Sequence, residues 1–178
     1  MKSVLISIKP KWCKLIASSK KRIEVRKTKP KIEVPFKVYI YCTKGDPVFT
    51  QSAFCNEVSN GKVIGEFVCE NIETIDLIYS ENLRQANSKI NEILKNSCLS
   101  AYDLLVYLSR DTTDKNGYAW YISSLVIYDK PMELSEFFYA CDKPRGTDCS
   151  VCLDHRENKC KSITRPPQSW CYVETKGE

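Results

Sequence analysis

A short alternation of charged and apolar residues near the start of the chain restricts its fold more than any other feature. The segment 22–26 reads Arg-Ile-Glu-Val-Arg, and Lys21 directly precedes it. In an extended strand, neighbouring side chains point to opposite faces, so Arg22, Glu24 and Arg26 would share one face. Ile23 and Val25 on the other face can then enter a core. A carboxylate held between cations suits a polar or anionic ligand.

The positive charge of the chain is concentrated in one segment. The 178 residues are 43% hydrophobic with a net charge of +5, which predicts one domain, 1–178, with a substantial core. Residues 9–37 hold eleven Lys and Arg and two acids, so they carry 11 − 2 = +9, while the remainder carries 16 − 20 = −4. Such a basic segment favours a polyanionic partner, because phosphates that are neutralised by lysine and arginine release their counterions. A solvated lysine-rich face is the alternative.

The sequence shows neither a secretory nor a membrane-spanning segment. Residues 3–8 are too short for a signal-peptide core, and no apolar run approaches the roughly 20 residues of a membrane helix. We therefore expect a cytoplasmic protein without a membrane partner, in a compartment where disulfides are rare. Six scattered cysteines are predicted to be small buried hydrophobes: Cys13, Cys42, Cys55, Cys69, Cys98 and Cys171.

The other four cysteines lie close together in the segment 141–160, which we interpret as a cysteine-rich insertion. Four thiolates are the ligand set of a structural zinc site, and the predicted ligands are Cys141, Cys149, Cys152 and Cys160. The segment has few apolar residues, so metal binding would supply its folding free energy. His155 or Cys171 could replace one ligand. A metal-free loop and a redox pair formed by Cys149 and Cys152 are the alternatives.

The coarse pattern predicts a mixed fold. Alternation and β-branched or aromatic residues predict strands at 3–8, 21–27, 36–42, 62–70, 118–128 and 169–174. Helices are predicted at 11–18, 81–95 and 99–108, the last with Ser100 as its cap, and Asn60-Gly61 predicts a tight turn. Because strands and helices do not alternate regularly, we expect an α+β protein. Its centre would be a small mixed β-barrel with flanking helices and a zinc-stapled insertion.

The first strand-turn-strand region resembles the ASCH domain family. The signature of that family is G-x-K-x-x-E-x-R, and Lys21, Glu24 and Arg26 match it, while Ser19 stands at the glycine position. Two later blocks, 63–67 and 118–122, resemble strands of the family's barrel, and 165–174 resembles its closing segment. The presence of Ser19 in place of glycine bears on how tight the turn into the second strand can be.

The resemblance implies a PUA-like barrel with a cleft that binds RNA, a nucleotide or a modified nucleoside. In such a cleft Lys21 and Arg26 would hold a phosphate or a base carbonyl, Glu24 would accept from an amine or a ribose hydroxyl, and Trp12 would stack on a base. Further ligand-binding candidates are Glu66, Ser169 and Trp170. The structural alternatives are a surface ion-pair ladder for the charged residues, a helix anchor for Trp12 and a barrel plug for Trp170. Trp120 is predicted to belong to the core.

The resemblance also implies a hydrolase as an alternative function. Some ASCH relatives hydrolyse N4-acetylcytidine with a lysine and a threonine, and this chain has Lys21 but places Glu24 at the threonine position. Others are described as nucleases. Glu24 could then act as a general base beside Lys21, which makes these two the catalytic candidates. The single histidine, His155, excludes a two-histidine ribonuclease mechanism. A third alternative is an adaptor that holds a protein partner through the zinc-dependent segment.

Overall fold

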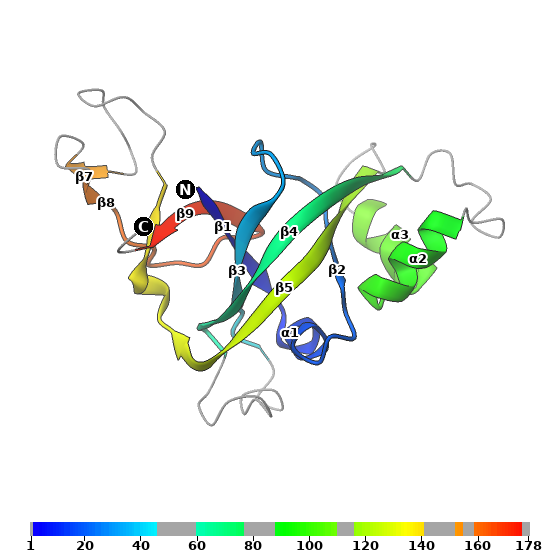
Figure 1. Ribbon diagram of the computed structural model, residues 1–178, viewed down its shortest axis with the longest axis horizontal. Coiled ribbons are helices and arrows are strands. Elements are labelled where there is room, and N and C mark those ends of the chain that lie inside the picture. Colours follow the sequence, from blue (N-terminus) through cyan, green and yellow to red (C-terminus); the bar gives the residue numbers. More distant parts are fainter. Residues whose placement is uncertain are drawn as a thin grey trace.

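A single mixed sheet forms the centre of the molecule (Figure 1). The computed structural model describes residues 2–45, 60–76, 88–109, 116–140, 152–154 and 159–175. The sheet consists of β1 (Ser3–Ile8), β2 (Ile23–Arg26), β3 (Phe36–Cys42), β4 (Val63–Asp76), β5 (Asn116–Met132), β6 (Phe137–Tyr139) and β9 (Trp170–Thr175). A separate hairpin pairs β7 (Cys152–Asp154) with β8 (Lys159–Cys160).

The strand order of the sheet is β2-β5-β4-β3-β1-β9-β6, and only the β1–β3 pair is parallel. Three strands separate β2 from β1 in this order, yet the two meet in space. The guanidinium Nη2 of Arg26 donates a hydrogen bond to the Ser7 carbonyl oxygen at 2.6 Å. The sheet therefore curves back on itself, although its backbone ladder does not close within the described residues.

The main core fills the hollow of this curved sheet. It contains Val4 and Ile6 of β1, Phe67 of β4 and the fully buried Trp120 of β5. Leu5, which alternates with Val4 and Ile6, enters a second cluster with residues of β6 and β9. Both faces of β1 are therefore covered, which explains why its sequence is a continuous apolar run rather than an alternation.

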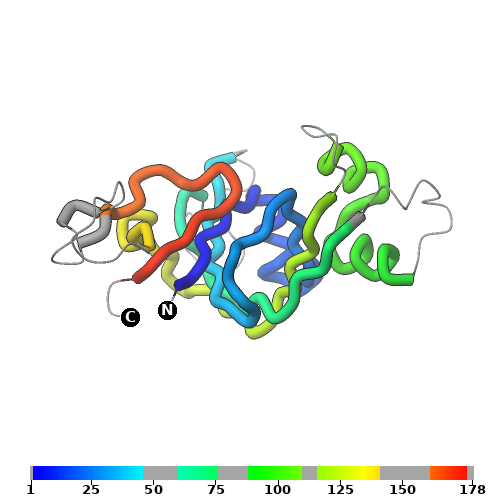
Figure 2. The backbone as a smooth tube through the Cα atoms, turned by 90° about the horizontal axis from the view of Figure 1, so that it is seen from above, coloured from blue at the N-terminus to red at the C-terminus, as the bar shows by residue number. Residues whose placement is uncertain are grey.

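Three helices flank the sheet. The first, α1 (Pro10–Ala17), contributes to the main core, whereas α2 (Ser88–Ser97) and α3 (Ala101–Ser109) pack against β2 through Ile23 and Val25. Figures 1 and 2 show α2 and α3 at one end of the molecule, with β6 and β9 at the other. Among the described residues, no helix has the length and apolar character needed to cross a membrane.

All six predicted strands are present; 3–8 and 36–42 have the predicted bounds, and the other four differ from them. β4 and β5 extend beyond the predicted ends, and β2 is shorter than the predicted 21–27. The predicted helix 81–95 is observed as Ser88–Ser97, and residues 81–87 lie outside the described part. The Ser100 cap is confirmed, because its Oγ accepts a hydrogen bond from the Asp103 backbone N–H at 3.0 Å. The short strands β6, β7 and β8 were not predicted.

Candidate ligand-binding cavity

A cavity of about 780 Å³ lies between β2, the end of β1 and the segment that leads into β9. The N-terminal end of α1, Thr43 after β3, Leu99 before α3 and Tyr107 of α3 also contribute to the described walls. The volume is within the range of sites for small organic ligands, about 300–1,000 Å³. Lys21, Glu24 and Arg26 all line it.

These three charged side chains form a buried triad. Only 3% of Lys21, 6% of Glu24 and 7% of Arg26 is exposed. The Glu24 carboxylate lies between the cations, with Oε1 3.0 Å from Arg26 Nη2 and Oε2 3.2 Å from Lys21 Nζ. The ion pairs of the predicted surface ladder therefore do form, but inside the protein.

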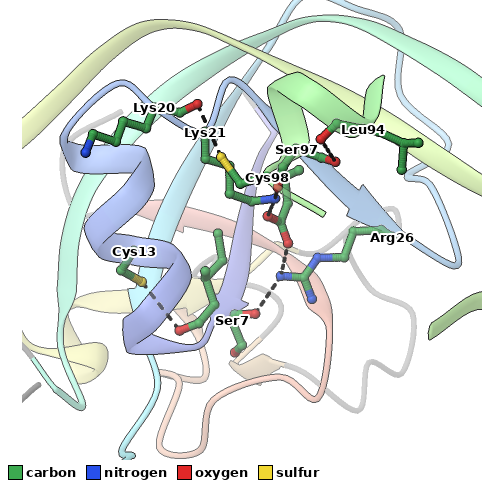
Figure 3. Close-up of polar contacts among 10 residues, drawn as sticks. Ser7, Cys13, Lys20, Lys21, Arg26, Leu94, Ser97 and Cys98 are labelled. Atoms are coloured by element: carbon green, nitrogen blue, oxygen red, sulfur yellow. Dashed lines mark hydrogen bonds and ion pairs between the residues drawn. The ribbon is translucent and has the colours of Figure 1, made fainter. Parts of the chain in front are cut away.

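Each cation of the triad also binds a backbone carbonyl of a distant element (Figure 3). Lys21 Nζ donates to the Ser97 carbonyl at the end of α2, at 2.8 Å, and Arg26 Nη2 donates to the Ser7 carbonyl of β1. Because β1 and α2 are far from β2 in the sequence, the triad holds the cavity walls together. It also fixes the positions of its own charged groups.

The division of faces predicted for 22–26 is confirmed for four of the five residues. Ile23 and Val25 pack into the cluster with α2 and α3, Glu24 and Arg26 line the cavity, and Val25 also contributes to that lining. Arg22 does not join them. It precedes the strand, is exposed, and donates from Nε to the Ser19 carbonyl at 3.3 Å. Lys21 supplies the second cation instead.

The turn at Ser19 explains how Lys21 reaches Glu24. Helix α1 ends in two backbone hydrogen bonds typical of a Schellman motif: Ser19 N–H to Ile16 O at 2.8 Å and Lys20 N–H to Leu15 O at 2.9 Å. Ser19 has a φ of +56°, the left-handed conformation that glycine adopts without strain. Serine therefore occupies the glycine position of the signature and keeps its backbone geometry.

Trp12 lies beside the triad, and its position is compatible both with the predicted stacking surface and with the predicted helix anchor. It lines the cavity and also packs against the main core. Lys21 Nζ is 5.1 Å from the centre of the Trp12 ring, and Lys11 Nζ is 4.3 Å from it. These distances are typical of cation–π contacts, which orient the indole at the cavity wall.

The cavity is positive and contains an unused donor. The charged lining residues are four cations (Lys9, Lys21, Arg26, Lys27) and one carboxylate (Glu24), so the formal charge is 4 − 1 = +3. Arg26 Nε is buried and has no hydrogen-bond partner among the described residues. A buried donor without an acceptor costs about 1–3 kcal/mol, which a ligand acceptor would offset.

Several polar lining residues were not among the predicted site residues, and Ser7 and Tyr107 are two of them. Ser7 donates from Oγ to the Pro167 carbonyl at 2.7 Å, and its N–H donates to the Ser169 carbonyl at 2.9 Å. Tyr107 also lines the cavity, where its hydroxyl can donate to a ligand, and burial raises its pKa. The sequence pattern that could have identified Ser7 is a polar residue within the apolar run 3–8. No such pattern marks Tyr107.

Of the remaining predicted ligand residues, one lines the cavity and two do not. Ser169 lines the cavity. Trp170 is not part of the lining: its ring packs near Trp120, with centroids 6.2 Å apart, and Nε1 donates to Thr28 Oγ1 at 3.0 Å. Glu66 on β4 is likewise outside the lining. It accepts a hydrogen bond from the Tyr128 hydroxyl at 2.6 Å and lies 3.5 Å from Lys37 Nζ.

The structure describes the cysteine-rich segment only in part. Cys141 and Cys149 lie outside the described residues, as do His155 and Cys55. The β7–β8 register places Cys152 directly opposite Cys160. Among the described residues, no three His, Cys, Asp or Glu side chains lie together in a way that could hold a metal ion. The zinc site therefore stays a prediction.

Three crystal structures have the same fold as this chain. ASCH from Zymomonas mobilis has a TM-score of 0.58 and 20% identity, over 97% of this chain and 87% of that chain. A tyrosine-to-phenylalanine variant of it has a TM-score of 0.54 and 22% identity, over 98% and 91%. A serine-to-alanine variant has a TM-score of 0.58 and 20% identity, over 97% and 88%. No protein-family model and no curated protein matches the sequence.

The comparisons and the sheet together define the class of the fold. Within the described residues the chain is a mixed α+β protein with a seven-stranded sheet and three α-helices. Its structural neighbours are ASCH domain proteins, so the resemblance predicted from Lys21, Glu24 and Arg26 is confirmed for the fold.

Proposed function

We propose that the chain binds RNA or a nucleotide, with one nucleotide or modified nucleoside held in the cavity. The observation that carries the proposal is the buried triad in a cavity of formal charge +3, where Arg26 Nε lacks a partner among the described residues. An anionic ligand with hydrogen-bond acceptors is complementary to such a cavity. The ASCH fold of the neighbours supports the same conclusion.

The lining residues divide into groups suited to the parts of a nucleotide. Lys9 and Lys27 are the less buried cations, and each can neutralise a phosphate as a point charge. Arg26 Nε can donate to a base carbonyl, and the Trp12 ring offers a stacking surface, typically worth ~1–3 kcal/mol per base. Glu24 can accept from an exocyclic amine, because each of its oxygens faces only one cation.

The arrangement favours binding over hydrolysis by Lys21 and Glu24. The Glu24 carboxylate is held in place by an ion pair at each oxygen, at 3.0 and 3.2 Å, which suits a group that orients a ligand. Lys21 Nζ is likewise held by the Ser97 carbonyl. In this geometry the triad positions a ligand and shapes the cavity.

Isothermal titration calorimetry with the four nucleoside monophosphates and N4-acetylcytidine tests the proposal. Lys9→Ala removes a cation of the cavity without removing a cap, because the Lys9 side chain makes no capping hydrogen bond. We expect it to weaken nucleotide binding about fivefold at 0.1 M salt, the effect of one lost phosphate contact. Lys14→Ala removes an exposed lysine of α1 outside the lining and serves as the matched control.

Two results of this titration would contradict the proposal. One is that none of the five compounds binds at millimolar concentration. The other is an equal loss of affinity in both lysine variants, which would indicate non-specific attraction. Chromatography of the same mixtures tests the alternative: product formation that is abolished in Glu24→Gln would indicate a hydrolase.

We also propose that Cys141, Cys149, Cys152 and Cys160 hold one structural zinc ion. Directly opposed residues of an antiparallel pair have Cα atoms about 4.5–5.5 Å apart, and Cys152 and Cys160 have this relation. That separation suits two ligands of one tetrahedral ion. Plasma mass spectrometry should find one zinc per chain, lost in Cys152→Ser and retained in Cys98→Ser. Absence of zinc from the purified protein would contradict the proposal.

The same variants test the adaptor alternative. A protein partner held by the cysteine-rich segment would dissociate in Cys152→Ser. Nucleotide binding in the cavity would persist, because the described lining of the cavity comes from other segments of the chain.

A further inference from the structure

A second basic surface begins where the cavity ends. The segment after β2 leaves the cavity at Lys27 and Thr28, which line it, and continues through Lys29 to Lys31. Its lysines alternate with other residues over this stretch. We call Lys29, Lys31 and Lys2, together with the tyrosines beneath them, the outer strip.

Aromatic side chains of three elements fix the position of this segment. Lys27 Nζ lies 5.6 Å from the Tyr107 ring of α3, and Lys29 Nζ lies 5.4 Å from the Tyr118 ring of β5. The Lys31 backbone N–H donates to the Tyr172 hydroxyl of β9 at 2.6 Å. The contact of Trp170 Nε1 with Thr28 Oγ1 adds a fourth attachment.

The strip continues beyond Lys31 onto the first strand. Lys2, directly before β1, places its Nζ 5.4 Å from the centre of the same Tyr172 ring. Segment 27–31 and the N-terminal end of β1 therefore meet at one tyrosine. An extended chain advances about 3.3–3.6 Å per residue, so Lys27 and Lys31 are at most about 14 Å apart. The ammonium groups of Lys27, Lys29 and Lys2 thus follow a path that starts in the cavity, and the Lys31 backbone lies at the tyrosine that Lys2 contacts.

We infer that the outer strip binds the sugar-phosphate backbone of a single-stranded RNA, one nucleotide of which occupies the cavity. This inference rests on the proposed function and names its ligand class: a polynucleotide rather than a free nucleotide. A row of separated cations fits the repeating phosphates of a strand, whereas one mononucleotide cannot reach them all. Cation–π contacts restrict the lysine side chains beforehand, which reduces the entropy lost on binding.

The charge balance of the strip supports a phosphate backbone as its partner. Segment 27–37 holds four lysines and a single acid, Glu33, which lies beyond Lys31. Lys29 and Lys31 are exposed, so each is accessible to a strand. Interleaved lysines and aromatic rings beside a groove are the general form of single-strand binding sites.

Affinity as a function of RNA length tests the inference. The ligands are a mononucleotide, a dinucleotide, a tetranucleotide and an octanucleotide of the base that binds best as a monophosphate. We expect the affinity to rise at least tenfold from the mononucleotide to the tetranucleotide. The double variant Lys29→Ala/Lys31→Ala should weaken tetranucleotide binding about 25-fold at 0.1 M salt and lower the slope of log K against log salt by about 1.4, the effect of two lost phosphates. Mononucleotide affinity should not change.

Lys14→Ala/Lys20→Ala is the matched control, because it removes two exposed lysines outside the cavity and the strip. Figure 3 shows the Lys20 side chain directed away from the triad. Thermal unfolding followed by circular dichroism should be similar for the two double variants.

The inference is overturned if the tetranucleotide binds no better than the mononucleotide, or if both double variants lose affinity equally. In either case mononucleotide binding in the cavity would leave the proposed function standing. Failure of every ligand to bind would overturn both.

Discussion

At the scale of single residues, the molecule depends on three charges that the sequence places near one another and the fold buries. Taking ions out of water costs several kcal/mol each, and the Glu24 carboxylate offsets this cost for Lys21 and Arg26 through direct ion pairs. The carbonyls of Ser97 and Ser7 complete the set of partners. The signature Lys-x-x-Glu-x-Arg predicts the contact but not the burial, because the covering elements come from distant parts of the chain.

Glu24→Gln tests the energetics of the triad. The substitution leaves two buried cations without their anion, so we expect it to reduce the free energy of unfolding by about 3–5 kcal/mol. Glu66→Gln is the control, since the Glu66–Lys37 ion pair is partly exposed and should be worth less than about 1 kcal/mol. Urea denaturation measures both. A smaller effect at Glu24 than at Glu66 would contradict the account of the triad.

At the scale of elements, local patterns predicted the pieces but not their long-range contacts. The apolar run 3–8, the alternation at 36–42 and the helix capped by Ser100 are encoded in adjacent residues, and each is present. β6, β7 and β8 have only two or three residues each, too few to show a period. Tyr107 became a cavity residue only through the packing of α3 beside β2.

The turn between α1 and β2 provides a test at this scale. Ser19 has a left-handed conformation that costs a non-glycine residue about 1 kcal/mol or more. Ser19→Gly should therefore raise the free energy of unfolding by about 1 kcal/mol and leave the turn unchanged. Ser18→Gly is the control, because Ser18 has a φ of −85° and gains nothing from glycine. Chemical denaturation measures the free energy of unfolding of both variants. A larger gain in Ser18→Gly than in Ser19→Gly would contradict the assigned turn geometry.

At the scale of the whole molecule, buried thiols couple stability to pH. Burial raises the pKa of Cys69 from 9.0 to about 12 and that of Cys171 from 9.0 to about 11. Above pH 9 the unfolded chain therefore releases protons that the folded protein keeps. Because the unfolded state binds fewer protons there, stability falls as pH rises.

Denaturation between pH 8 and pH 11 measures this coupling. Each retained thiol proton contributes a loss of about 1.4 kcal/mol per pH unit above pH 9. Cys69→Ala should make the decline less steep by that amount, whatever its effect on stability at neutral pH. Ile122→Ala, which removes a non-titrating side chain opposite Cys69 in the β4–β5 pair, is the control and should leave the slope as it is. An unchanged slope in Cys69→Ala would contradict the assigned burial effect.

A crystal structure of the protein grown with its best-binding nucleotide tests the central claim most directly. The account predicts density for the nucleotide inside the cavity formed by β1, α1 and β2. An acceptor atom of the ligand should lie within hydrogen-bond distance of Arg26 Nε. A nucleotide bound elsewhere on the protein, with only solvent beside Arg26, would contradict it.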